Sequence, residues 1–137
     1  MTTRISMVLS TVLACLGFWC AAEAHHSTAA EFDTRKPITF TGTVKKVQWM
    51  NPHIYTHVEV KTPDGNTVVY QVEGGPPNAL YRRGWRMNSL KVGDKVTVTG
   101  FRAKNEESPH VGQATITGAD GKRVFAGTGP SRVAEQQ

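Results

Sequence analysis

The sequence predicts an all-β fold with one short helix, an OB-like small barrel of five or six strands. Three observations support this prediction. Apolar and polar residues alternate along several short segments, as in strands with one buried face. The alternation changes parity once within the first long segment, as a β-bulge requires. A short helix that starts at proline separates three expected strands from at least two more, which is the order of an OB-type barrel.

The first 24 of the 137 residues predict export. Arg4 is the one basic residue among them, Ile5–Cys20 is mostly apolar, and Ala22-Glu23-Ala24 closes the segment. This is the pattern of a secretory signal with an A-x-A cleavage site. The apolar run is shorter than the roughly 20 residues that a bilayer-crossing helix needs. We therefore expect residues 1–24 to be a cleaved signal peptide, the protein to be periplasmic or secreted, and the mature chain to have no transmembrane segment.

Both cysteines, Cys15 and Cys20, lie in the expected signal peptide. The mature chain would then have no disulfide and no thiolate ligand. In an alternative interpretation, Cys15 is lipidated after Leu13-Ala14, but this would require an unusually short apolar region.

The formal net charge of +5 survives cleavage, because one basic and one acidic residue leave together. Outside the cytoplasm the acidic partners for such a chain are lipid head groups, polysaccharide or another protein. Nucleic acid is scarce there, so we do not expect it as a partner. The simpler alternative is that the charge only keeps the protein soluble.

The first expected strand is long and bent. Residues 25–36 show no clear period and lead to Pro37, so we expect a histidine-containing arm outside the sheet, followed by one domain at 37–126. The apolar positions then run through Ile38, Phe40, Gly42 and Val44 and resume at Val47 and Trp49. This change of parity predicts a β-bulge across Lys45-Lys46.

The next two strands form a predicted hairpin. Asn51-Pro52 breaks the first strand, and Pro63-Asp64-Gly65 forms a turn. A three-residue loop would pair Val60 with Val68, Val58 with Tyr70 and Thr56 with Val72 on the apolar face. A two-residue loop would set Val58 against Gln71, so the pattern selects the first register. On the polar face it places Tyr55 opposite Glu73, His57 opposite Gln71 and His53 diagonal to Glu73.

The remaining elements are shorter. Asn78–Arg83 is a predicted helix with proline at its start and Gly84 after its end. Later strands are expected around Val96–Phe101 and Ala114–Ile116, and Asp120-Gly121 predicts a tight hairpin to Val124. We expect the tail, residues 127–137, to be disordered because it is rich in Gly, Pro and Gln.

An OB-type barrel binds ligands on strands 2 and 3 and on the loops that join strands 1–2 and 4–5. Here these two loops contain Met50–His53 and Ser108–His110. The fold would therefore bring two histidines to one rim. Without another ligand beside it, His110 is expected to be an exposed side chain.

Three motifs carry a resemblance to a family: Ala24-His25-His26-Ser27, Asn51-Pro52-His53, and the block from Glu73-Gly74-Gly75-Pro76-Pro77 to Trp85. From His25 to about Gly127 the chain resembles an uncharacterised family of small exported bacterial proteins. The resemblance implies a secreted or periplasmic single domain of unknown function. Its histidine motifs match at His25, His26 and His53, whereas His57 and His110 lie outside them.

The predicted metal ligands are His25, His26 and His53. Cleavage after Ala24 would let the α-amine and imidazole of His25 chelate one ion, with His26 or His53 completing a nitrogen-rich site that suits copper(II), with zinc as second choice. Cleavage after Ala22 would leave Glu23-Ala24-His25, which can also hold copper(II). The alternative is that these histidines form a solvated arm. His53 and His57 lie about 13 Å apart along a strand, which is too far to share one ion.

Two other groups of residues bear on function. Arg82, Arg83 and Arg86 around Trp85 would suit an anionic partner, or they extend over a tryptophan that closes the barrel end. Serines lack a nucleophile context and acidic residues are scattered, so we do not expect an enzyme. The sequence thus predicts an exported small binding protein for a transition metal. The alternative is a metal-free interaction module that docks an envelope protein or an anionic glycan.

Overall fold

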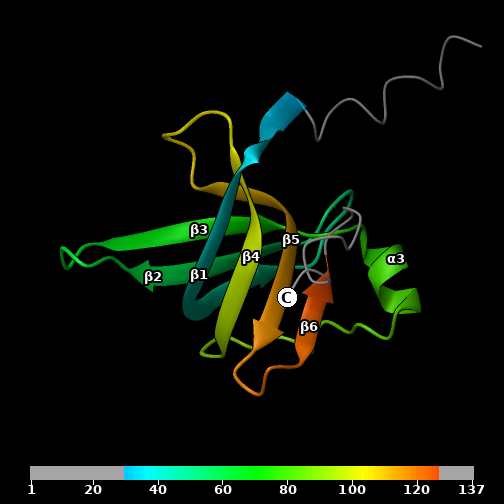
Figure 1. The fold of residues 1–137 in the computed structure, drawn as a ribbon. Helices are drawn as coiled ribbons and strands as arrows, with labels where there is room; N and C mark the ends of the chain where they lie inside the picture. Colours follow the sequence, from blue (N-terminus) through cyan, green and yellow to red (C-terminus); the bar gives the residue numbers. More distant parts are fainter. Residues whose placement is uncertain (1–29, 127–137) are drawn as a thin grey trace, which may run out of the picture. The chain divides into compact units, whose positions relative to one another are not determined.

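The computed structural model describes residues 30–126, which form six strands and one short helix (Figure 1). The elements in chain order are β1 (Phe32–Gln48), β2 (Tyr55–Lys61), β3 (Thr67–Glu73), α3 (Pro77–Arg82), β4 (Lys95–Ala103), β5 (His110–Gly118) and β6 (Arg123–Ala126). None of the helices in this part of the chain is long and apolar enough to cross a bilayer.

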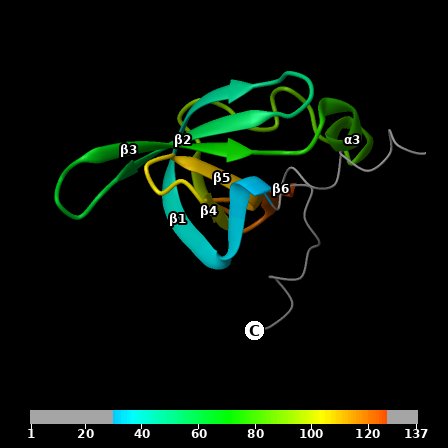
Figure 2. The same cartoon turned by 90° about the horizontal axis from the view of Figure 1, so that it is seen from above.

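The strands form one sheet in the order β3-β2-β1-β4-β5-β6. A parallel pairing of β3 with β5, through Gln71 opposite His110 and Val72 opposite Val111, closes five strands into a ring. Figure 2 shows β5 crossing beneath the β2–β3 hairpin, whose turn extends beyond the ring. The prediction of an all-β, OB-like fold with one short helix is confirmed.

The inner face of the ring is the hydrophobic core. Every main strand of the ring contributes fully buried aliphatic side chains, among them Val44, Val58, Val72, Val98 and Ile116. Leu80 of α3 and Leu90 of the following loop join the same cluster. Because apolar and polar residues alternate, the apolar side chains of each strand lie inside the ring. The opposite face of β2 and β3 carries the polar side chains.

The predicted pairings of the first three strands are confirmed. Val60 lies opposite Val68, Val58 opposite Tyr70 and Tyr55 opposite Glu73. On the other side of β2, Val44 pairs with Val58 whereas Lys46 pairs with His57, so the bulge lies at Lys45 as predicted. The bulge changes which face of β1 is buried, as the parity change requires.

The helix runs from Pro77 to Arg82, one residue earlier at each end than expected. Gly84 follows it with φ +91°, a left-handed conformation that costs a glycine little and that ends many helices. The amide of Arg83 donates to the carbonyl oxygen of Leu80, which closes the last turn.

One sequence-based expectation is wrong: residues 32–36 are not part of an arm outside the sheet. β1 begins at Phe32, which pairs with Ala103 of β4. The ring of Phe32 lies on Gly112 of β5, where it occupies the space that a Cβ atom would need. The segment shows no period because Phe32 is buried and residues 34–37 are exposed, while the pairing with β4 is irregular between Phe32 and Pro37. Residues 1–29 and 127–137, including the expected signal peptide and tail, lie outside the described residues.

Candidate functional site

The polar face of β2 and β3 carries the ionisable side chains that could bind a ligand. Pairing places Tyr55 beside Glu73 and His57 beside Gln71, and the β3–β5 pairing adds His110 beside Gln71. Directly paired residues project to the same side of a sheet. His110 therefore joins the face that the sequence predicted for β2 and β3.

His53 stands at the end of this face because the β2–β3 ladder continues past Tyr55. The amide of Gly74 donates to the carbonyl oxygen of Ile54, and the amide of Ile54 donates to that of Gly75. Gly74 and Gly75 are buried, so the glycine-proline block serves to bring the chain close to Ile54. His53 is thereby fixed next to the last residue of β3, Glu73.

His53 and Glu73 form a close pair. Nδ1 of His53 lies 2.5 Å from Oε1 of Glu73, and the two side chains are 29% and 12% exposed. Burial raises the pKa of the Glu73 carboxyl, His53 opposes that rise, and the charge of Glu31 adds to it. A nearly buried carboxylate is thus stabilised by its histidine partner, which is the predicted diagonal neighbour.

A second pair of the same kind lies close by. Nδ1 of His110 is 3.2 Å from Oε1 of Glu31, and both side chains are more exposed than the first pair. The backbone of Glu31 is held by a hydrogen bond from the amide of Lys104 to its carbonyl oxygen. Glu31 and His110 both affect the pKa of the Glu73 carboxyl, so the two pairs belong to one electrostatic cluster.

Tyr55 is the first residue of β2, where it pairs with Glu73 of β3 and with Gln48 of β1. Burial raises the pKa of its phenol, and the negative charges of Glu73 and Glu31 raise it further. The hydroxyl is therefore neutral at ordinary pH, and it can donate a hydrogen bond or accept one.

His57 has a different partner from His53. Its Nε2 lies 2.6 Å from Oε1 of Gln48, so the ring donates its Nε2 hydrogen to the amide oxygen. Burial lowers the pKa of His57, and the nearby charges of Lys46 and His110 lower it further. His57 is thus held as a neutral side chain by Gln48, whereas the partner of His53 is Glu73.

We expect His57→Gln to reduce the loss of stability between pH 7 and pH 5. The lowered pKa of His57 means that the unfolded chain takes up its proton first. The contribution of His57 to the free energy of unfolding is therefore fully present above the pKa that His57 has in the unfolded chain. This contribution is lost as the pH falls through the pKa that His57 has in the folded protein. Urea unfolding of the wild type and the variant at several pH values gives the slope of the free energy of unfolding against pH. Equal slopes for the two proteins between pH 7 and pH 5 would contradict the prediction.

Of the three predicted metal ligands, the structure places one, His53, beside other ionisable side chains. His53 lies in the cluster, whereas His25 and His26 lie outside the described residues. Within residues 30–126, no three His, Cys, Asp or Glu side chains are grouped so that they could hold a metal ion. This part of the chain offers histidine–carboxylate pairs, and a complete site would need further ligands.

Sequence reasoning missed Glu31 and Gln48 as partners of histidines. Gln48 had a usable signal, because the predicted bulge places it near the start of β2, opposite Tyr55. Glu31 had none, because it lies in a segment without a visible period.

The arginine-rich segment has a structural role in part. Trp85 packs against the core cluster, in agreement with the view that it closes one end. Arg86 donates to the carbonyl oxygens of Tyr81 and Trp85, and its guanidinium lies 4.0 Å from the centre of the Tyr81 ring. Arg82 and Arg83 are exposed.

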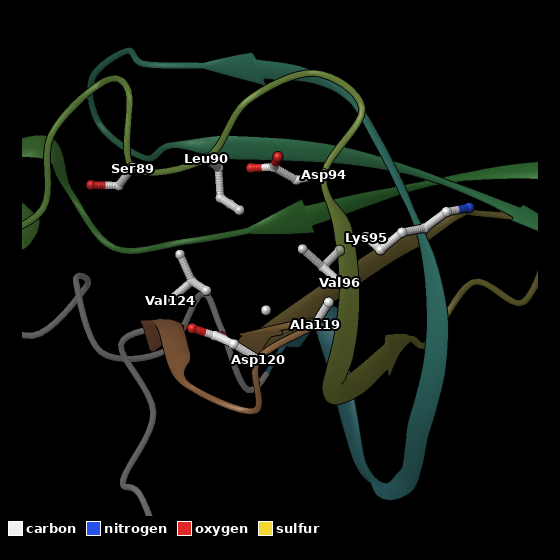
Figure 3. Close-up of a pocket in the computed structure, with 9 residues that line it drawn as sticks. Ser89, Leu90, Asp94, Lys95, Val96, Ala119, Asp120 and Val124 are labelled. Carbon is white, nitrogen blue, oxygen red and sulfur yellow. The ribbon is translucent and has the colours of Figure 1, made fainter.

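A cavity of about 290 Å³ lies apart from this cluster, between the loop before β4 and the β5–β6 hairpin (Figure 3). Asp94 and Asp120 line it, but each carboxylate already accepts a backbone amide of its own turn, from Lys91 and Lys122. The two carboxylates therefore stabilise the turns that border the cavity.

Within residues 30–126, the closed ring of strands and the short helix α3 define a small all-β fold of the OB-like class. The chain belongs to the family of unknown function DUF6152, whose model matches residues 12–112. The predicted membership of an uncharacterised family is thus confirmed, whereas its motifs and its export stay predictions. No curated protein and no solved structure matches the chain.

Proposed function

We propose that this protein is an exported, periplasmic binding protein that holds a transition-metal ion, copper first and zinc second, through His53 together with His25 and His26. The observation that carries the proposal is the pair of His53 with Glu73. A histidine that binds a metal through one ring nitrogen commonly donates the N–H of its other ring nitrogen to a carboxylate. This hydrogen bond fixes the ring and makes the ligating nitrogen more basic. The role is one of binding and not of catalysis.

The length of the chain supports a contribution from the N-terminal histidines. His26 precedes Glu31 by five residues, and Glu31 belongs to the same cluster as Glu73. Five residues span at most about 18 Å, so His26 stays within that distance of Glu31. Imidazole and amine nitrogens, without thiolates, are ligands that copper(II) and zinc accept.

The test is intact mass of the protein produced with its own export segment, followed by copper(II) and zinc titration of that sample. We expect a mass that starts at His25, near-stoichiometric copper binding, and a large loss of affinity in His25→Ala. His57→Ala is the matched control, because its Nε2 is engaged by Gln48. A mass that starts at His25 combined with weak binding would refute the proposal.

A second candidate is a metal-free interaction module that docks an envelope protein or an anionic glycan. The observation in its favour is that Arg82 and Arg83 are exposed at the end of α3, on a chain of net charge +5. Arg82→Glu separates the two proposals. It should abolish docking of an anionic glycan and leave copper binding unchanged.

A further inference from the structure

We propose that the arginine-rich segment, residues 81–87, binds the surface of an anionic lipid bilayer. Its arginines meet the phosphate groups of the lipids, and its exposed apolar side chains lie at the level where the acyl chains begin. The proposal is independent of the metal-binding function. It assigns to this segment one partner, a lipid surface, in place of the envelope protein or anionic glycan of the second candidate function.

The first argument is the exposure of large apolar side chains. Tyr81 is 58% exposed, and Met87 at 71% is the most exposed of the large hydrophobic side chains in residues 30–126. Trp85 lies between them in the chain and packs against the core cluster. The core thus anchors the segment through Trp85, and one apolar side chain on each side of it faces solvent. The segment can therefore place apolar area at the acyl boundary of a bilayer without disturbing the core.

The second argument is charge. Residues 74–93 contain four basic residues and no acidic one. Arg82 and Arg83 are exposed, and within residues 30–126 neither guanidinium has a hydrogen bond or an ion pair. Basic side chains close to an anionic lipid surface each add to the attraction. Both arginines are thus available for lipid phosphates, which a guanidinium binds with two parallel hydrogen bonds.

The third argument is that the segment is ordered by its own contacts. Nη1 of Arg86 donates to the carbonyl oxygens of Tyr81 and Trp85, and its guanidinium lies 4.0 Å from the centre of the Tyr81 ring. The amide of Arg86 donates to Oγ of Ser89. These contacts hold the Tyr81 ring beside a positive charge. A ring that is apolar and carries a polar hydroxyl suits the boundary between head groups and acyl chains.

The combination of charge and apolar exposure favours a lipid surface over an anionic glycan. Arginines suit either partner, because both present anionic oxygens. Met87 gains little from a hydrated glycan, whereas burial of its apolar side chain among acyl chains is favourable. An acidic protein with an apolar surface is the other partner of this chemistry, and the test below separates it.

The structure offers a matched control for the charge of the segment. α3 and the turn of the β2–β3 hairpin lie on opposite sides of the ring of strands in both views (Figures 1 and 2). Lys61, the exposed last residue of β2, adjoins that turn. Lys61→Glu therefore changes the net charge as much as Arg82→Glu does, but on the side away from α3.

The test is flotation of the exported protein with vesicles of phosphatidylglycerol and phosphatidylcholine, compared with vesicles of phosphatidylcholine alone. We expect binding only to the anionic vesicles, and weaker binding as salt is added. Arg82→Glu should weaken this binding by roughly 25-fold, because each unit of charge near such a surface is worth about a factor of five. Lys61→Glu should bind like wild type.

Met87→Ala separates a lipid surface from an anionic glycan. The variant keeps every charge and should keep its stability, because the side chain is exposed. The loss of apolar area should weaken vesicle binding roughly tenfold. Retention on a dextran sulfate column, which offers anionic groups and no acyl chains, should be the same for Met87→Ala and wild type.

Three results would overturn the proposal. Vesicle binding that Met87→Ala leaves unchanged would exclude contact with the acyl chains and favour an anionic glycan. Equal losses in Arg82→Glu and Lys61→Glu would mean that the net charge of the whole chain attracts the vesicles. A wild-type protein that binds no anionic vesicle would leave an envelope protein as the partner of this segment. None of these results affects the metal-binding proposal, whose ligands lie outside residues 81–87.

Discussion

Replacement of His53 by alanine is expected to weaken copper(II) binding by more than the roughly 10- to 100-fold that loss of an outer-shell partner costs. The change removes a ligand itself and leaves Glu73, which is only 12% exposed, without its imidazole partner. Competition against a chelator of known affinity measures the loss. Because the ligand is the neutral imidazole, acidification should release the ion from the wild type in the same assay.

Two further variants decide whether the loss reflects ligation. His53→Gln retains a donor for the Glu73 carboxylate but is a poor ligand, so it should bind copper as weakly as His53→Ala while its fold is better preserved. Glu73→Gln keeps the ring and removes the charge, and it should show the smaller, outer-shell loss. Wild-type affinity in His53→Gln would show that the ring is structural and that the ion is held elsewhere.

The sequence was a good guide wherever alternation was uninterrupted. Val58, Tyr70 and their neighbours could be paired from the pattern alone, because a shift by one residue would have turned every apolar side chain outward. The bulge at Lys45 followed from the same rule. In the candidate site this rule also predicts that His53 lies near Glu73, and the two side chains do form a pair.

The rest could not be predicted because it depends on pairings between distant segments. Glu31 meets His110 through contacts of the chain around Phe32 with β4 and β5, and the two residues are 79 positions apart in the chain. The segment carries one buried aromatic ring and a run of exposed residues, so no local periodicity marks it as a strand. Likewise, His110 joins the face of β3 through a parallel pairing of only two residue pairs.

Phe32→Ala is expected to lower the free energy of unfolding by about 3–5 kcal/mol, the usual loss when a buried aromatic ring is truncated. Phe32 is 2% exposed, and its ring fills the space that a side chain at position 112 would need. Urea unfolding should give a lower midpoint. Met87→Ala, at a side chain that is 71% exposed, is the control and should change stability little. A loss of less than about 1 kcal/mol in Phe32→Ala would contradict this prediction, because it would mean that the start of β1 contributes little to the stability of the fold in solution.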